Sequence, residues 1–98
     1  MAVKVLIKRT CPKDKERELF HIIKEIRRMV PLQPGYISSE YLKSIGEKSE
    51  IAAISSWYTL EDWQAWFESD ERKEIQSKID AIPGVETEYS IFRYIKTR

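Results

Sequence analysis

The stretch SSWYTLEDWQAWFESDERKEIQ, residues 55–76, holds all three tryptophans of the chain and predicts how its second half folds. Thr59 has the features of a helix N-cap residue, and Asp62 three positions later resembles the acid of a capping box. Ser69 begins a second such pattern, and the two acidic residues after it suit the positive end of a helix. The stretch therefore predicts a strand that ends at Trp57, followed by two short helical segments.

Alternating apolar residues on both sides of this stretch predict strands. These strands cover residues 2–10, 36–45, 50–57 and 85–97. Between the first two strands, apolar residues recur at helical spacing from Leu19 to Val30, which predicts a helix that ends near Pro31. The order β-α-β-β-α-β is typical of a ferredoxin-like α+β fold, in which helices cover one face of an antiparallel sheet. The length of the chain fits one domain over residues 1–98.

Both faces of the predicted sheet carry apolar residues. An antiparallel sheet with one face in water alternates between apolar and polar residues, but residues 51–54 of the third strand are apolar throughout. The last strand has Tyr89, Ile91 and Ile95 on one side and Phe92 and Tyr94 on the other. Because one layer of helices covers only one face, the pattern predicts a two-fold homodimer with the two sheets face to face.

Composition and charge predict which partners the chain lacks. A net charge of +1 gives no general attraction to nucleic acid or to an anionic membrane. No apolar run approaches the ~20 residues of a transmembrane helix, and the N-terminus lacks signal-peptide features. Cys11 is the only cysteine, which predicts no disulfide, no cysteine-based zinc site and a reduced, cytoplasmic location. An incidental cysteine is the plain interpretation, and a thiol activated by Lys8 and Arg9 is the alternative.

Two stretches carry a resemblance to a known family. QPGYISSEYLKS (residues 33–44) and ISSWYTLEDWQAWFESDERKEI (residues 54–75), followed by an aromatic last strand, resemble the antibiotic biosynthesis monooxygenase (ABM) family. The most specific part is W-x-x-x-E-D/A-W-x-x-W-x-x-S. The resemblance implies a small protein that forms a dimeric α/β barrel. It leaves the chemistry open, because members include quinol and polyketide oxygenases, haem-degrading enzymes and proteins of other function.

Haem degradation can be tested on single positions. The haem-degrading branch resembles this chain at Trp66 but has its iron-ligating histidine ten residues later, where this chain has Gln76, a poor iron ligand. That branch also uses an asparagine on the first strand, and Ile7 occupies about that position. The only histidine, His21, points away from the apolar stripe of the first helix. The sequence therefore predicts no haem, no other cofactor and no metal.

The resemblance then implies a cofactor-independent monooxygenase that oxidises an aromatic polyol or quinol. A deprotonated phenol can itself pass an electron to O₂, so the protein needs an apolar pocket, aromatic walls and a group that stabilises the phenolate. We expect that pocket between the helices and the sheet, with a small aromatic molecule as ligand. The candidate catalytic residues are Trp57, Arg93 and Tyr94, and the candidate substrate-binding residues are Tyr36, Arg9, Trp66 and Phe67. Trp57 would form a pocket wall and donate a hydrogen bond to the ligand, Arg93 and Arg9 would supply charge, and Tyr36 and Tyr94 would bond or relay a proton.

Each candidate also has a purely structural interpretation. Trp57 is the core residue of a strand end, Arg93 pairs with an acid such as Glu86 or Glu40, and Tyr94 fills the dimer interface. Trp66 lies on the flank of its helix, as a cleft rim or a subunit contact. A non-catalytic dimer that binds a small apolar or aromatic molecule, or acts as a stress or accessory protein, is therefore the alternative function. Isomerase or lyase chemistry would need a buried carboxylate, for which Glu40 is the candidate.

Overall fold

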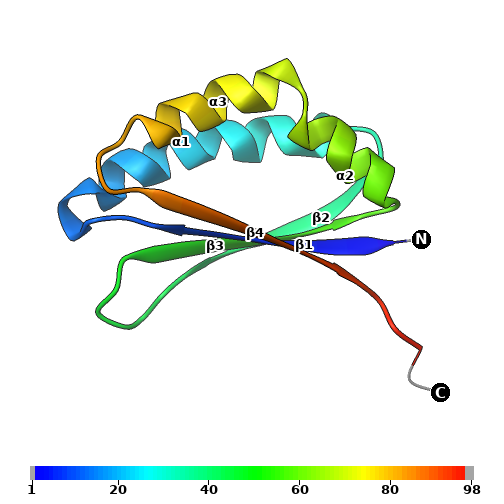
Figure 1. Cartoon of the computed structure of the whole chain (residues 1–98), viewed down its shortest axis with the longest axis horizontal. Coiled ribbons are helices and arrows are strands. Elements are labelled where there is room, and N and C mark those ends of the chain that lie inside the picture. Colours follow the sequence, from blue (N-terminus) through cyan, green and yellow to red (C-terminus); the bar gives the residue numbers. More distant parts are fainter. Residues whose placement is uncertain (1, 97–98) are drawn as a thin grey trace.

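The computed structural model describes residues 2–96 and confirms the predicted order of elements. The elements are β1 (Val3–Thr10), η1 (Lys13–Lys15), α1 (Glu16–Met29), η2 (Val30–Leu32), β2 (Tyr36–Lys43), β3 (Glu50–Trp57), α2 (Leu60–Phe67), α3 (Asp70–Asp80) and β4 (Glu86–Arg93). The strands form one antiparallel four-stranded sheet in the order β2-β3-β1-β4. All three α-helices lie on one face of this sheet (Figure 1). The fold is therefore the predicted ferredoxin-like α+β fold.

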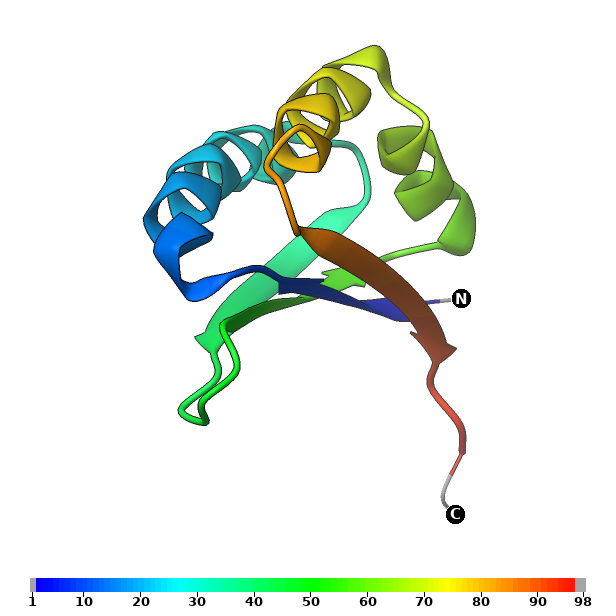
Figure 2. The same ribbon diagram turned by 60° about the vertical axis from the view of Figure 1, so that its left-hand side comes forward.

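Three strands are shorter than predicted, the first by its single residue 2. The second strand ends at Lys43 rather than at residue 45. The last strand ends at Arg93, because Arg93 pairs with Val3, the first residue of β1, and no strand lies alongside the chain beyond that point. Residue 97, the predicted end of this strand, lies outside the described residues. The chain after β4 leaves the sheet on the side away from the helices (Figures 1 and 2).

The two predicted helix caps are confirmed. Oγ1 of Thr59 accepts a hydrogen bond from the N–H of Asp62 at 3.0 Å, and Oγ of Ser69 accepts one from the N–H of Arg72 at 3.2 Å. The start of α2 also touches the turn before β2. Gly35 adopts a φ of +82°, and a Cβ at this position would overlap the carboxylate of Asp62. This close approach requires glycine and holds the first turn of α2 against the sheet.

The core lies between the helices and the sheet. Its buried apolar residues come from all three helices and from the central strands: Val3, Val5, Leu19, Ile23, Ile26, Val30, Ile51, Trp57, Trp63, Trp66, Ile75, Ile79 and Ile82. The other face of the sheet has no helices over it, and Leu42 and Phe92 there are 50% and 54% exposed. Within residues 2–96 no helix combines the length and the apolar character needed to cross a membrane.

Candidate functional site

Antiparallel pairing places the helix-facing side chains of the four strands in rows across the sheet. At one end the row contains Tyr36, Trp57, Val3 and Arg93, and at the other end it contains Lys43, Ile51, Arg9 and Thr87. Val3 and Arg9 are six residues apart on β1, so at ~3.3 Å per residue the two rows are about 20 Å apart. Side chains from the first and the last row therefore cannot bind the same small functional group.

Aromatic rings fill the space behind the first row. The ring of Trp57 meets Tyr36 and Trp63 edge to face, with centroids 5.6 and 5.8 Å apart, and Trp63 lies 5.6 Å from Phe67. We call these four residues the aromatic cluster. Such pairs stabilise a core by about 0.5–1.5 kcal/mol beyond the burial of their area. The cluster therefore fastens α2 to the end of the sheet.

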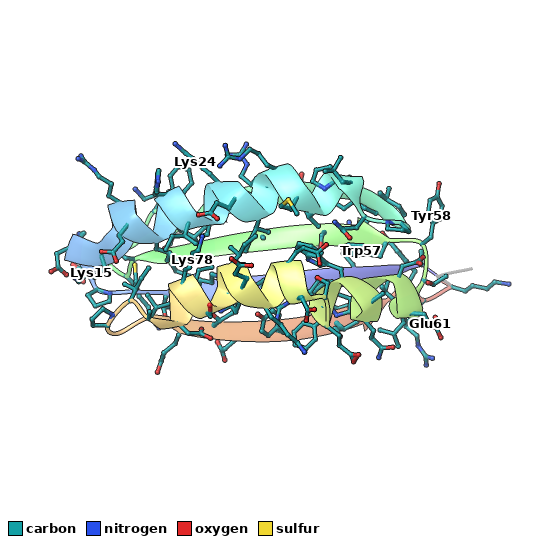
Figure 3. The ribbon with its side chains drawn as sticks, turned by 90° about the horizontal axis from the view of Figure 1, so that it is seen from above. Lys15, Lys24, Trp57, Tyr58, Glu61 and Lys78 are labelled. Carbon is teal, nitrogen blue, oxygen red and sulfur yellow. The ribbon has the colours of Figure 1, made fainter. Side chains whose placement is uncertain are left out.

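Trp57 was predicted to be a pocket wall that donates a hydrogen bond to a ligand. Its side chain is completely buried, and its indole N–H donates to Oγ of Ser55 at 3.0 Å. Figure 3 shows Trp57 beneath the helical layer, between α1 and α2. Trp57 is therefore part of the core, and its donor already has a partner within the chain.

The expectation that Trp66 lies at the rim of a cleft or in a subunit contact is corrected by the structure. It is only 3% exposed and belongs to the core. The chain turns into α3 immediately after it, since both the N–H and the hydroxyl of Ser69 donate to the carbonyl of Trp66. The flank of α2 therefore faces the core. A helical wheel drawn for α2 alone cannot show this, because the position of α3 decides it.

Three buried side chains, Arg9, Arg72 and Gln76, and the partly buried Tyr89 form a hydrogen-bonded chain, the arginine network. Nη2 of Arg9 donates to Oε1 of Gln76 at 3.0 Å, and the hydroxyl of Tyr89 donates to the same oxygen at 3.3 Å. Nη1 of Arg72 donates to the hydroxyl of Tyr89 at 2.9 Å. Burial lowers the pKa of Arg9, and the charge of Arg72 acts in the same direction. Gln76 thus accepts two hydrogen bonds at the position where a haem-degrading relative has its iron ligand.

Neither of the two buried arginines forms an ion pair with a carboxylate of residues 2–96. The ion pairs among residues 2–96 are Lys43 with Glu16 and Lys78 with Glu25. Instead, the guanidinium of Arg72 lies over the ring of Phe67, 4.3 Å from its centroid. One acid is joined to the network: Oδ1 of Asp80 accepts from Nε2 of Gln76 at 2.9 Å. Gln76 therefore connects the charge of Arg9 to a carboxylate near the surface.

Sequence reasoning considered Gln76 only as a missing haem ligand. A usable signal was present in β1, where Arg9 continues the helix-facing series of Val3, Val5 and Ile7. A charged residue in phase with buried ones needs a polar partner from the opposing layer. Gln76 follows Ile75 of the apolar stripe in α3 and is the residue that supplies this partner.

A cleft opens at the β4 edge of the sheet, beside the first row. It has a volume of about 620 Å³ and is lined by Val3, Leu60, Glu61, Ile91, Phe92 and Arg93. We call it the β4-edge cleft. Figure 3 shows Glu61 at the start of α2, on its outer side. The volume lies in the range of small-molecule pockets. Apart from the guanidinium of Arg93 and the carboxylate of Glu61 the lining is apolar, so it offers an aromatic ligand one cation and one proton acceptor.

The structure brings some of the predicted site residues together and separates others. Tyr36, Trp57 and Arg93 share the first row, whereas Arg9 lies in the last one. Phe67 packs in the aromatic cluster beneath Arg72. Tyr94 lies beyond β4 and is exposed, with the ammonium of Lys4 5.9 Å from its ring centroid. Lys4 alternates with the buried Val3 and Val5, so Tyr94 lies on the face opposite the aromatic cluster.

Three other expectations can be compared with the structure. The alternative that Cys11 carries an activated thiol is wrong. Burial is the main cause that raises the pKa of this thiol, and the nearby charges of Glu16 and Asp14 raise it further. His21 is exposed, as predicted. Glu40 is exposed and therefore lacks the burial that a general base of an isomerase would need. Among the described residues, no three His, Cys, Asp or Glu side chains lie close enough to hold a metal ion.

Comparisons with known proteins were made for both sequence and fold. The family model described as antibiotic biosynthesis monooxygenase matches residues 2–78. No curated protein is significantly similar in sequence. SnoaB from Streptomyces nogalater, described as a cofactor-independent oxygenase, has 14% identity and a TM-score of 0.84, over 98% of this chain and 95% of its own. Rv0793 from Mycobacterium tuberculosis has 9% identity and a TM-score of 0.86, and the match covers 98% of this chain and 97% of Rv0793. A conserved protein from Methanosarcina mazei has 20% identity and a TM-score of 0.82, and the match covers 95% of this chain and 92% of that protein.

Proposed function

Because the chain belongs to the antibiotic biosynthesis monooxygenase family, we propose that it is a cofactor-independent monooxygenase that oxidises an aromatic polyol or quinol with O₂. The β4-edge cleft is the proposed substrate site. The observation that carries this proposal is Arg93, an exposed guanidinium on a mainly apolar cleft of about 620 Å³. No ion pair in the described part of the chain includes Arg93. Its charge is therefore available to a phenolate.

The proposed reaction needs no external reductant. Loss of the phenolic proton, to Glu61 across the cleft or to water, leaves a phenolate that Arg93 stabilises. The phenolate gives one electron to O₂, and the resulting radical pair joins to form a carbon–oxygen bond. Cleavage of the O–O bond leaves one oxygen atom on the ring and releases the other as water. The substrate supplies all four electrons, so a quinol and O₂ yield a hydroxyquinone and water.

The predicted homodimer is part of the proposal. The open face of the sheet carries Leu6 and Ile54 half-buried and Phe92 more than half exposed, and none of them has a helix above it. Figure 2 shows the β2–β3 hairpin and the chain after β4 both extending beyond this face, on either side of it. A second sheet placed there would cover these residues. Since Phe92 also lines the β4-edge cleft, the partner would complete the wall of the substrate site.

Oxygen uptake by metal-free protein tests the proposed activity. The substrates are a panel of hydroquinones and polycyclic phenols, each corrected for its own autoxidation. We expect Arg93→Gln to lower uptake by about a hundredfold, the effect of removing one donor to a developing oxyanion. Trp57→Phe should lower it less, because the indole lies behind the cleft. The matched control is Arg28→Gln on α1, outside the cleft. Equal rates in Arg93→Gln and wild type would refute the site.

The alternative is a dimer that binds a small aromatic molecule without reacting with it. The internal hydrogen bond from Trp57 to Ser55 leaves the proposed chemistry without an indole donor, whereas binding in the β4-edge cleft needs none. Saturable binding of the same phenols, with no oxygen consumption for any of them, would support this alternative.

A further inference from the structure

A second cleft lies at the opposite edge of the sheet, between α1 and β2. It has a volume of about 630 Å³, and we call it the β2-edge cleft. In the sheet order β2-β3-β1-β4, three strand spacings of ~4.8 Å separate the two edge strands, which is about 14 Å. The β2-edge cleft is therefore a separate site, and nothing in the proposed oxygenation uses it.

The lining of this cleft is strongly positive. Arg17, Arg27 and Lys43 contribute three cations, and Glu16 is the only acid among the lining residues. Glu16 is already paired with Lys43, with 2.7 Å between Oε1 and Nζ. Among residues 2–96 no ion pair includes either of the arginines. Two net positive charges thus gather in this cleft, in a chain whose whole net charge is only +1.

The body of the cleft is apolar and aromatic. Phe20, 41% exposed, lies on the α1 side, while Tyr41 and Ile51 come from the sheet. The guanidinium of Arg27 lies 5.1 Å from the centroid of the Tyr41 ring. Stacking of this kind restrains the arginine and leaves its in-plane N–H groups free to bind a planar anion with two hydrogen bonds.

The two arginines mark the ends of the cleft. Ten residues separate them on α1, which corresponds to about 15 Å along the helix axis. Arg17 shares its end with the carboxylate of Glu16, which repels an anion. No acid lines the cleft at the Arg27 end. An anionic group therefore binds best at Arg27, and an apolar body extends from it along Phe20.

We propose that the β2-edge cleft is a second small-molecule site, which binds an elongated organic anion with an aromatic or aliphatic body and one carboxylate or sulfonate group. Arg27 holds the anionic group, Phe20 and Ile51 contact the body, and Arg17 adds a weaker attraction at the far end. Charge selects the ligand, and the length of the cleft limits its size.

A fluorescence titration of the purified protein, in whatever oligomeric state it has, with 8-anilino-1-naphthalenesulfonate tests this proposal. N-phenyl-1-naphthylamine, which has the same rings without the sulfonate, is the neutral control probe. We expect the sulfonate probe to bind wild type at least tenfold more tightly than the neutral one. Arg27→Gln should weaken binding of the sulfonate about tenfold or more, as expected for loss of a charged hydrogen-bond donor, and should leave the neutral probe unchanged. Arg17→Gln should weaken it about twofold to threefold.

Two control variants locate the bound probe. Arg28→Gln removes an equal charge from the neighbouring position of α1, outside the cleft, and should leave the affinity within twofold of wild type. Arg93→Gln alters the β4-edge cleft and should also have no effect. Unchanged affinity in Arg27→Gln would overturn the proposal, and so would a loss in Arg93→Gln, which would place the probe at the β4 edge. Circular dichroism of each variant confirms that it is folded.

Discussion

The aromatic cluster and the arginine network lie side by side in the same layer, yet they hold the helices to the sheet in different ways. The cluster uses burial and ring contacts, which depend little on direction. The network uses directional hydrogen bonds between charged and polar groups, each of which costs free energy if its partner is lost. Tyr89 joins the two, because its ring meets Phe67 edge to face at 5.2 Å while its hydroxyl bonds Gln76 and Arg72. The stability of the half that holds the aromatic cluster therefore depends mainly on packing. The stability of the half that holds the arginine network depends mainly on its hydrogen bonds.

The largest effect is expected in the aromatic cluster. Trp57→Ala removes a fully buried indole and should lower the free energy of unfolding by about 3–5 kcal/mol, while Trp57→Phe, which keeps a ring in the cluster, should cost less than half as much. Urea denaturation measures both. Tyr58→Ala is the matched control, because Tyr58 is 66% exposed, and should change stability by less than about 0.5 kcal/mol. Similar losses at the two positions would contradict the assignment of Trp57 to the core.

The arginine network should respond differently to single and double substitutions. Gln76→Met leaves the buried Arg9 without its acceptor and should cost about 1–3 kcal/mol. Replacing both residues by Met removes donor and acceptor together, so the double variant should be more stable than the sum of the single effects predicts, by about 1 kcal/mol. Additive losses in the double-mutant cycle would show that the hydrogen bond between the two side chains contributes no coupling.

Removing one helix cap destabilises the helix that carries either the aromatic cluster or Gln76, without changing a side chain of the cluster or of the network. Thr59→Ala removes the cap of α2, which carries the aromatic cluster, and Ser69→Ala removes the cap of α3, which carries Gln76. Each should lower the free energy of unfolding by about 1 kcal/mol. We expect Thr59→Ala to change the near-ultraviolet circular dichroism of the tryptophans more than Ser69→Ala does, because α2 carries Trp63 and Trp66 while the Ser69 side chain bonds Trp66 only at its backbone carbonyl. An equal spectral change in both variants would mean that the two halves are not separate in their packing.

The smallest effect is expected at the surface ion pair of the β2-edge cleft. The hydrogen bond from Lys43 lowers the pKa of Glu16, so the stability that this pair contributes is present above the ordinary pKa of a glutamate and is lost as pH falls through the lowered value. Lys43→Gln should thus be slightly less stable than wild type at pH 7 and equal to it at acid pH. A gap between the two proteins that widens towards acid pH would refute this.

The sequence predicted the local features well and missed those that depend on distant contacts. The bounds of β3 and both helix caps were predicted correctly, because hydrophobic alternation and capping act within a few residues. The hydrogen bond between Arg9 and Gln76 joins residues 67 positions apart, so no local pattern reports it. The burial of Trp66 depends on where α3 turns. Alternation along the last strand did place Tyr94 on the side of Phe92, opposite Tyr89, but the end of β4 at Arg93 depends on the pairing with Val3.

The central claim is that this chain is a monooxygenase that needs no cofactor, and labelled oxygen tests it most directly. Metal-free protein would be given ¹⁸O₂ and the panel of hydroquinones and polycyclic phenols, with Arg93→Gln and a protein-free sample in parallel. The account predicts, for at least one substrate, a product with one ¹⁸O atom, the second ¹⁸O in water, and loss of both in Arg93→Gln. Absence of label from every product, or labelling equal to that of the protein-free sample, would contradict it.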